Sequence, residues 1–266
     1  MTSVGIENSI QRGEFENWAI YTRSRFSQAA ESELAKYESE NKVTKTPIPQ
    51  HLGFGTLGAI GFLVTIFAVP ILQTMVPDVP MSAIGRMDNS QIAAKDWWRP
   101  VTSLTLHADI PHLIANAFFG VILGVGLTRY LGSGYGWFLI LLGGVMGNIL
   151  SAALRVDHYI SLGASTAVFA SLGIMATYVW RRGYYRSGGL RRSLTPLFGA
   201  VALFSFAGIG DLRTDVVAHL TGLVSGMGLG FVAARFDPRR LGKSGQFICG
   251  GLAMGSLIFC WMRALG

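Results

Sequence analysis

Long runs of apolar residues, separated by short polar segments, make up most of the chain after residue 50. A helix needs about 17–25 apolar residues to cross a bilayer, and most of these runs reach that length. They lack the alternation of barrel strands, and a membrane accepts only helices or closed barrels because every backbone polar group must be paired. We therefore expect seven transmembrane helices. They lie roughly at 52–75, 111–131, 134–154, 163–180, 194–210, 215–234 and 246–265.

The first fifty residues have a different pattern. Mostly apolar residues recur at helical spacing between residues 7 and 42, which predicts one or two amphipathic helices. These residues are Phe15, Trp18, Thr22, Phe26, Ala30, Leu34 and Tyr37. The stretch VTKTPIPQH (43–51) predicts a linker that contains proline. The helical segment could pack on itself or on a second subunit, or it could contact the membrane surface or regulate the protein, and the sequence leaves these alternatives open.

The distribution of charge predicts an orientation. Charged residues are 14% of the chain, whereas a soluble domain has about a quarter. Five arginines and no acid lie within 181–192, and four basic residues and one acid, Asp237, lie within 235–243. Cytoplasmic loops are rich in Lys and Arg, so we expect these loops, the N-terminal tail and the turn at Arg129 in the cytoplasm and the C-terminus outside. The loops also explain the net charge of +7 without a nucleic-acid partner.

Four polar residues lie inside the predicted membrane helices. They are His112, Asn116, Ser165 and His219. A polar group inside a membrane is costly, so each is a candidate functional residue. His112 and Asn116 are four residues apart and share one helix face. The three helices that carry the four residues all run inward from the outside in the expected topology, so the residues share one depth near the outer surface.

This set of residues is suited to nucleophilic acyl transfer. A serine becomes a good nucleophile when a histidine within hydrogen-bond reach takes its proton, and Ser165 and His219 are the candidates. The oxyanion that forms needs donors, which Asn116, His112 and the backbone N–H of Ser165 can supply. Gly163 would allow the backbone to bend and expose this N–H. This chemistry needs no metal and no cofactor.

Small residues indicate that two of these helices pack closely. Gly222, Gly226 and Gly230 repeat every four residues on the face of His219, a pattern that permits close backbone contact between membrane helices. A lone serine in such a helix is usually a packing residue, and a lone histidine or asparagine usually bonds a neighbouring helix. The presence of four polar groups at one depth favours the functional interpretation.

Three stretches resemble the motifs of the rhomboid intramembrane serine proteases, and they occur in the order of that family. WWRPVTSLTLHADIPHLIANAFF (97–119) resembles the Trp-Arg loop element followed by the second helix, which implies that Trp98 and Arg99 belong to a lateral, membrane-embedded loop. GAS (163–165) resembles the nucleophile motif, and DVVAHLTGLVSGMGLG (215–230) resembles the helix that carries a histidine and glycines.

The resemblance implies roles for individual residues. The matching positions are Trp98, Arg99, His107, His112, Asn116, Gly163, Ser165, His219, Gly222 and Gly226. By this resemblance, Ser165 and His219 form a catalytic dyad without an acidic third member. His112, Asn116 and the Ser165 amide form the oxyanion hole.

The resemblance, which covers roughly 97–234, also implies an architecture and a substrate. We expect an all-α polytopic membrane protein, with a rhomboid-like six-helix core (51–242), an additional C-terminal transmembrane helix (243–266) and a cytoplasmic N-terminal helical segment with its linker (1–50). Its substrates would be single-span membrane proteins, cut near the outer face of a bacterial inner membrane. The oligomeric state stays open.

One residue departs from the family motif, which usually reads Gly-x-Ser-Gly. Here Thr166 follows the serine and adds a branched side chain where the helix begins. We interpret this as a change of crowding and not as the loss of a reacting group.

Other functions fit the same residues less well. GIGD (208–211) matches a motif of intramembrane aspartyl proteases, but that mechanism needs two membrane aspartates that share a proton, and Asp211 falls in an outer loop. Metalloproteases of the His-Glu-x-x-His type are excluded because that motif is absent. A transporter is disfavoured because no inverted repeat is visible. The alternative that stays open is a catalytically impaired relative that binds or escorts transmembrane clients.

Overall fold

The computed structural model describes residues 4–12, 18–40, 51–53, 55–93, 95–184, 189–207 and 214–266. The chain forms two compact units, Met1–Lys45 and Thr46–Gly266, and each is described by itself. Phe15, Arg186, Asp211 and most of the linker at 43–51 lie outside the described residues.

The N-terminal unit contains a β-hairpin followed by one helix. Strands β1 (Asn8–Arg12) and β2 (Trp18–Thr22) pair antiparallel, and α1 (Ser27–Glu40) follows a short 3-10 turn, η2 (Ser24–Phe26). The helical prediction was therefore wrong for the two strands and holds only for α1. Trp, Ile, Tyr and Thr in β2 favour strands, and Ile10 lies opposite Ile20 across the hairpin, where such pairs stabilise a sheet.

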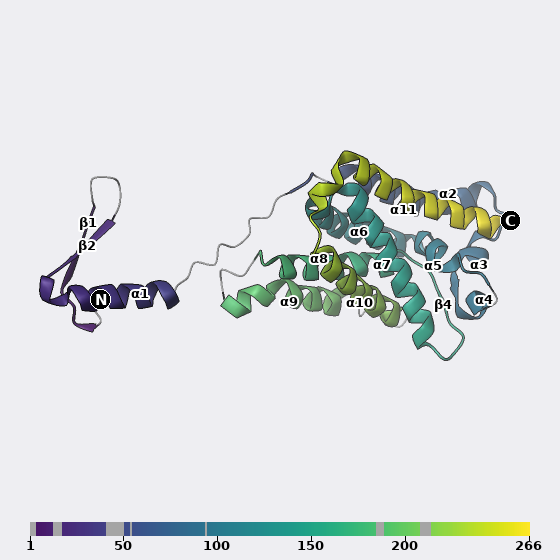
Figure 1. Cartoon of the computed structure of the whole chain (residues 1–266). Helices are drawn as coiled ribbons and strands as arrows, with labels where there is room; N and C mark the ends of the chain where they lie inside the picture. Colours follow the sequence, from purple (N-terminus) through teal and green to yellow (C-terminus); the bar gives the residue numbers. More distant parts are fainter. Residues whose placement is uncertain are drawn as a thin grey trace. The chain divides into compact units, whose positions relative to one another are not determined.

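The second unit is a bundle of membrane helices (Figure 1). Each of the seven apolar runs overlaps one long helix. The helices are α2 (Thr56–Met75), α6 (Ile110–Leu131), α7 (Ser133–Leu154), α8 (Ser165–Arg182), α9 (Gly189–Ala207), α10 (Val216–Ala233) and α11 (Gly242–Leu265). Five segments in the described part of the chain are long and apolar enough to cross a membrane: α2, α6, α7, α10 and Pro238–Leu265, which contains α11. The protein is therefore an all-α polytopic membrane protein, as the sequence predicts.

Helix α8 lies at the centre of the bundle, in contact with α6, α7, α9 and α10. Most of its residues are buried, and Arg181 and Arg182 lie in its last turn. These arginines and several small polar residues lower its hydropathy, and the neighbouring helices shield the polar residues from lipid. Helix α9 also carries two arginines, Arg191 and Arg192, near its start. That α8 and α9 span the bilayer stays a prediction.

The long connection between α2 and α6 is structured. It contains α3 (Met81–Gly85), β3 (Met87–Asp88), α4 (Asn89–Ala93), α5 (Arg99–Thr102) and the 3-10 turn η3 (Ser103–Thr105). Strand β3 pairs antiparallel with β4 (Ile160–Ser161), which lies just before α8. The connection is thereby joined to the segment that leads into Ser165.

Helices α8 and α10 touch backbone to backbone. A methyl group at Gly222 would lie 2.3 Å from the carbonyl oxygen of Thr166, and one at Gly226 would lie 2.1 Å from that of Ala170. Gly173 of α8 makes the reciprocal contact, because a methyl group there would lie 2.2 Å from the carbonyl oxygen of Leu223. Only glycine permits this approach, which places the start of α8 beside the start of α10.

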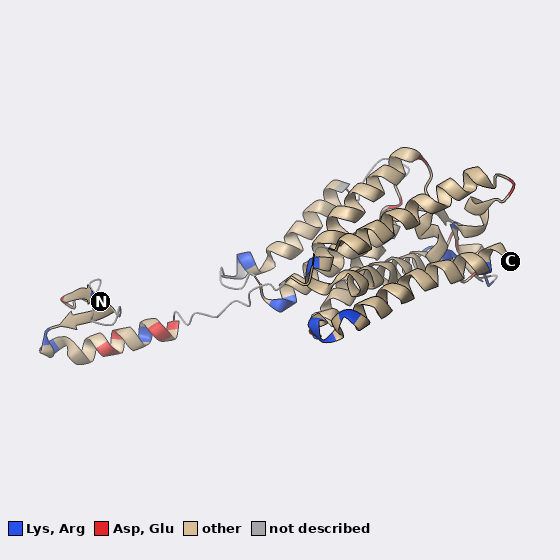
Figure 2. Ribbon diagram, turned by 90° about the horizontal axis from the view of Figure 1, so that it is seen from above, with Lys and Arg blue, Asp and Glu red and all other residues tan. Residues whose placement is uncertain are grey.

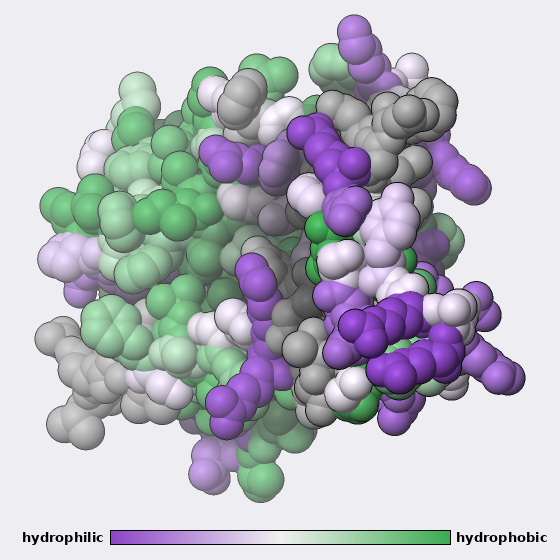
Figure 3. Space-filling model, turned by 90° about the vertical axis from the view of Figure 1, so that its left-hand side faces the viewer, coloured by the Kyte–Doolittle hydropathy of each residue, from purple (hydrophilic) through white to green (hydrophobic). Residues whose placement is uncertain are grey.

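Charge and hydropathy are distributed over the surface as a bilayer requires. Lys and Arg lie mainly at helix ends and not in the middle of the helices (Figure 2). Arg181 and Arg182 end α8, while Arg239 and Arg240 lie in the 3-10 turn η5 (Pro238–Leu241) before α11. On the face drawn in Figure 3, hydrophobic side chains form one broad area on the left.

Candidate functional site

Ser165 is the first residue of α8, and its side chain is half-buried. The first N–H groups of a helix have no intrahelical acceptor, so the Ser165 N–H is available as a donor. Two residues earlier, Gly163 has φ +136°, a conformation that glycine adopts readily and other residues rarely do. The backbone therefore turns sharply before Ser165 and leaves its N–H at the start of the helix.

His219 lies in the first turn of α10 and faces Ser165. Its Nε2 is 2.8 Å from Ser165 Oγ, a normal hydrogen-bond distance. The imidazole is only 8% exposed, and the ring of Phe169 packs against it with 4.6 Å between ring centroids. Since Phe169 is one turn after Ser165 on α8, the same helix supplies the hydroxyl and a wall that holds the imidazole.

The start of α10 is fixed by Asp215. Its carboxylate accepts a hydrogen bond from the Ala218 N–H at 3.0 Å and so caps the helix. The same carboxylate forms an ion pair with Arg155, whose guanidinium lies over the Tyr159 ring at 4.1 Å. This ion pair joins the segment before α8 to the first turn of α10. Sequence reasoning missed it because the two residues are far apart in the chain and neither belongs to a motif.

His112 and Asn116 lie in the first two turns of α6. The His112 ring lies against Gly163, since a methyl group there would be 2.6 Å from the ring carbon Cε1. Asp109 caps α6 by accepting from the His112 N–H at 2.8 Å. Asn116 is buried and donates through Nδ2 to the His112 carbonyl at 2.9 Å. An amide nitrogen carries two protons, so this bond leaves the second one available.

His107 is a neutral neighbour of His112. The two rings meet edge to face with 5.3 Å between centroids, and the Ala164 N–H points to His107 Nε2 at 3.5 Å. Burial, together with the adjacent His112, lowers the pKa of His107 from 6.5 to about 3. His107 is therefore uncharged at physiological pH, and it packs between the start of α6 and the residue before Ser165.

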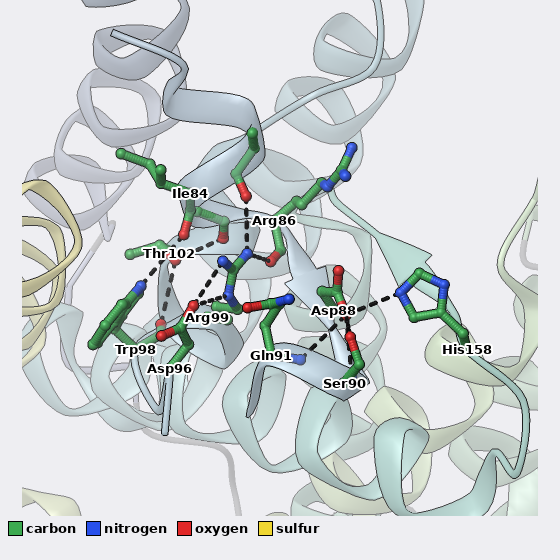
Figure 4. Close-up of polar contacts among 12 residues, drawn as sticks. Ile84, Arg86, Asp88, Ser90, Gln91, Asp96, Trp98, Arg99, Thr102 and His158 are labelled. Atoms are coloured by element: carbon green, nitrogen blue, oxygen red, sulfur yellow. Dashed lines mark hydrogen bonds and ion pairs between the residues drawn. The ribbon is translucent and has the colours of Figure 1, made fainter. Parts of the chain in front are cut away.

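Trp98 and Arg99 lie in the connection between α2 and α6 and shape it from inside (Figure 4). The Arg99 guanidinium is buried and donates to the carbonyls of Ala83 and Arg86 at 3.0 Å. It also pairs with the Asp96 carboxylate at 2.7 Å. Trp98 donates through Nε1 to the Ile84 carbonyl at 3.3 Å. In the described structure these two side chains hold the loop together and have no contact with Ser165.

Asp88 attaches the same loop to the segment before α8 (Figure 4). Its carboxylate accepts from the Ser90 hydroxyl at 2.6 Å and lies 3.1 Å from His158 Nε2. Burial by itself would raise the pKa of Asp88, but the hydrogen bonds from Ser90, Gln91 and His158 outweigh it and lower the pKa. Asp88 is therefore ionised and fixes the β3–β4 junction.

Asn148 was not singled out from the sequence, although an amide inside an apolar run was a usable signal. It is buried in α7, and its Nδ2 donates to the Pro100 carbonyl at 2.9 Å and to Ser103 Oγ at 3.1 Å. The Ser103 carbonyl accepts from the Gly163 N–H at 3.0 Å. Through this chain of bonds, α7 and η3 fix the backbone that precedes Ser165.

Thr166 fits into space left by two glycines. It is buried, and its methyl carbon Cγ2 would lie 2.7 Å from a methyl group at Gly147 of α7 and 3.0 Å from one at Gly222 of α10. Both neighbouring helices therefore have glycine where Thr166 carries its branch. Within the described residues, no three His, Cys, Asp or Glu side chains cluster closely enough to hold a metal ion.

The chain matches the sequence model of the Rhomboid domain over residues 94–236, just over half of its 266 residues. The match begins just before Trp98 and ends just after α10. It therefore contains Ser165, His219 and every other residue of the site described above except those that precede residue 94.

Curated proteins give the same family. Rhomboid protease GluP of Bacillus subtilis (strain 168) is 27% identical over 246 residues, which cover 90% of this chain and 45% of GluP. YdcA of the same organism is 28% identical over 152 residues, which cover 57% of this chain and 75% of YdcA. RHOMBOID-like protein 6, mitochondrial, of Arabidopsis thaliana is 32% identical over 154 residues, which cover 57% of this chain and 49% of that protein. The chain thus spans about half the length of two of these relatives.

Proposed function

Because the chain belongs to the rhomboid family, we propose that it is an intramembrane serine endopeptidase in which Ser165 and His219 form the catalytic dyad. One observation carries the proposal: His219 Nε2 lies 2.8 Å from Ser165 Oγ, within the reach that a general base needs. The two residues come from different helices that glycines hold in direct contact. A serine that served only for packing would not need this partner.

The proposed reaction begins when Ser165 Oγ attacks the scissile carbonyl carbon and His219 Nε2 takes the hydroxyl proton. The resulting oxyanion is stabilised by the Ser165 N–H, the His112 ring and the Asn116 amide, and each such donor is worth about 10²–10³ in rate. The protonated His219 then gives its proton to the leaving amine, and the acyl-enzyme remains on Ser165. A water activated by the neutral His219 hydrolyses this ester.

No acidic side chain has to orient the imidazole in this mechanism. Phe169 packs against one face of the His219 ring, and the Asp215 cap fixes the first turn of α10. Packing and the start of the helix therefore do the orienting that a third residue does in a triad.

The substrates that fit this site are single-span membrane proteins. The four site residues are near the starts of α6, α8 and α10, so they share one end of the bundle, and the arginines of α8 and η5 lie at the other end. With Lys and Arg in the cytoplasm, cleavage takes place near the outer face of a bacterial inner membrane. The N-terminus is then cytoplasmic and the C-terminus outside.

Labelling with a fluorophosphonate probe tests the proposal on purified, detergent-solubilised protein. We expect the wild type to be labelled at its activated serine and Ser165→Ala and His219→Ala to lose labelling. Ser171→Ala is the matched control, because this buried serine on the same helix donates to the Val168 carbonyl at 2.7 Å, and the variant should be labelled like the wild type. Cleavage of a single-span reporter in liposomes should follow the same pattern.

The second candidate is a client-binding protein without protease activity, and Thr166 beside the serine is the feature that favours it. A folded, monodisperse wild type that takes no label and leaves the reporter intact would replace the protease proposal with this one.

A further inference from the structure

A groove lies at the surface of the membrane unit between α2, α7 and α11. Its volume is about 630 Å³, within the range of about 300–1,000 Å³ found for ligand sites. Gly61 and Phe62 of α2, Trp137 of α7 and Gly251 of α11 belong to its walls. A methyl group at Gly61 or Gly251 would meet no atom within 4 Å, so these two glycines leave the groove open. The lining is almost entirely apolar and therefore suits a hydrocarbon chain.

One end of the groove is positively charged. Arg239 of η5 and Lys243 in the first turn of α11 line it. Arg239 is paired with Asp237 at 2.7 Å, whereas no carboxylate of the described residues lies within ion-pair distance of Lys243. The N–H of the first α11 residue, Gly242, donates to the Arg239 carbonyl, so the positive charge at this end comes from the two basic side chains. An anion at this end would interact with the Lys243 ammonium.

Gln246 fixes the charged end in place. Its Nε2 donates to the Leu131 carbonyl and its Oε1 accepts from the Tyr135 N–H, both at 2.9 Å. These bonds attach the first turns of α11 to the turn between α6 and α7. The position of Lys243 on the bundle is therefore set without a ligand.

The length of the groove is that of an acyl chain. Lys243 and Leu257 both line it and are fourteen residues apart on α11, which corresponds to about 21 Å at 1.5 Å per residue. Half of a bilayer's hydrocarbon core is about 15 Å thick. A chain that starts at the charged end therefore crosses its own leaflet and ends beyond the midplane, towards Thr105 and Ala164, which line the other end of the groove.

We propose that this groove binds one anionic phospholipid, with its headgroup at Lys243 and the start of α11 and one acyl chain along α2 and α11. The orientation given above places the charged end in the cytoplasmic leaflet, where basic pockets between membrane helices bind anionic headgroups. A zwitterionic phospholipid fills the same apolar groove but gains less from Lys243. The headgroup end of the site lies at the opposite end of the bundle from Ser165, and lipid binding does not depend on protease activity.

Native mass spectrometry of the full-length protein in detergent tests the proposal, with phosphatidylglycerol and phosphatidylcholine of identical chains as the probes. We expect one phosphatidylglycerol to bind at least about fivefold more tightly than phosphatidylcholine, the factor that one Lys near a headgroup supplies. Lys243→Gln should remove this preference. Arg192→Gln, which removes an exposed charge from the start of α9, should keep it.

Leucine substitutions at glycines of the groove test its apolar part. Gly251→Leu places a side chain in the groove and should lower the binding of both lipids, and Gly61→Leu should do the same from the opposite wall. Gly255→Leu is the control, since a side chain there also meets open space but does not line the groove. Thermal unfolding of each variant separates a filled groove from a misfolded protein. Equal affinity of the wild type for the two lipids, or a preference that survives Lys243→Gln in a folded protein, would overturn the proposal.

Discussion

Ser165 and His219 are 54 residues apart in the chain and are joined by one hydrogen bond of 2.8 Å. The position of each residue depends on nearby glycines. Gly163 permits the turn before Ser165, and Gly222 permits the Thr166 backbone to approach α10. Thr166 itself is accommodated because Gly147 leaves room for its methyl group. At this scale the site is a set of close contacts in which a single added methyl group has large effects.

His107 gives a prediction for stability as a function of pH. Burial beside His112 lowers its pKa to about 3, against 6.5 in an unfolded chain, so between these values the unfolded state binds a proton that the folded state does not. Stability therefore falls as the pH is lowered from 6.5 towards 3. His107→Gln should reduce this fall, measured as the change of Tm in detergent between pH 6.5 and pH 4.

The control is His51→Gln, because His51 is exposed and contacts the Tyr130 ring at the opposite end of α6 from His107. It should leave most of the pH dependence in place. A His107→Gln protein whose Tm falls with pH as steeply as that of the wild type would show that another group carries the effect.

At the scale of elements, the pair α8 and α10 is the part of the bundle on which the site depends. Their backbones touch at Gly222 and Gly226, and the first turn of α10 is fixed by Asp215, which also pairs with Arg155. The connection between α2 and α6 supports the same place through the bond from the Gly163 N–H to the Ser103 carbonyl. The distance between Ser165 and His219 is therefore a property of helix packing.

Gly222→Ala tests this dependence. The new methyl group would lie 2.3 Å from the Thr166 carbonyl oxygen, so the two helices must separate and His219 must move away from Ser165. A displacement of about 1 Å can cost about a hundredfold in rate, and we expect a loss of that order in the rate of fluorophosphonate labelling.

Gly228→Ala on the same helix is the matched control, because its methyl group would meet nothing within 4 Å. Alanine is favoured over glycine in a helix by about 1 kcal/mol, so this variant should be labelled at the wild-type rate and should not unfold at a lower temperature. If Gly222→Ala were labelled equally fast, the glycine contact would not set the geometry of the dyad.

At the scale of the whole molecule, α11 covers the side of the bundle opposite α9. It contacts the connection between α2 and α6 through Trp261, whose Nε1 donates to Thr105 Oγ1 at 3.0 Å, and through Phe259, whose ring lies 5.8 Å from that of Trp97. Its first turn is bonded to the turn between α6 and α7 by Gln246. The C-terminal helix is therefore an integrated part of the membrane unit.

The proposed topology is testable on intact cells. With Cys249 and Cys260 replaced by serine, single cysteines at Ser244 and at Gly266 should lie on opposite sides of the membrane, because α11 separates them. We expect a membrane-impermeant maleimide to label Gly266→Cys in intact cells and Ser244→Cys only after permeabilisation. The reverse pattern would place the arginine-rich end outside and invert the proposed cleavage side.

The sequence alone determined the membrane class and the places of the long helices, since crossing a bilayer requires about twenty consecutive apolar residues whatever the helices pack against. It also indicated the polar residues of the site, because polar groups inside apolar runs stand out singly. The helical expectation was wrong for residues 8–12 and 18–22, because periodicity within one segment cannot register pairing with a second strand.

The tertiary structure decided what depends on contacts between distant segments. It brought Arg155 to Asp215, Asn148 to Ser103 and the glycines to the space around Thr166. No local sequence pattern predicts these contacts. Each partner is an ordinary residue in its own segment, and its role comes from the residue that it contacts in a distant segment. The groove beside Lys243 also depends on contacts between distant segments. A bilayer accepts an apolar helix whatever that helix packs against, and only the packing of the helices leaves a space between α2 and α11.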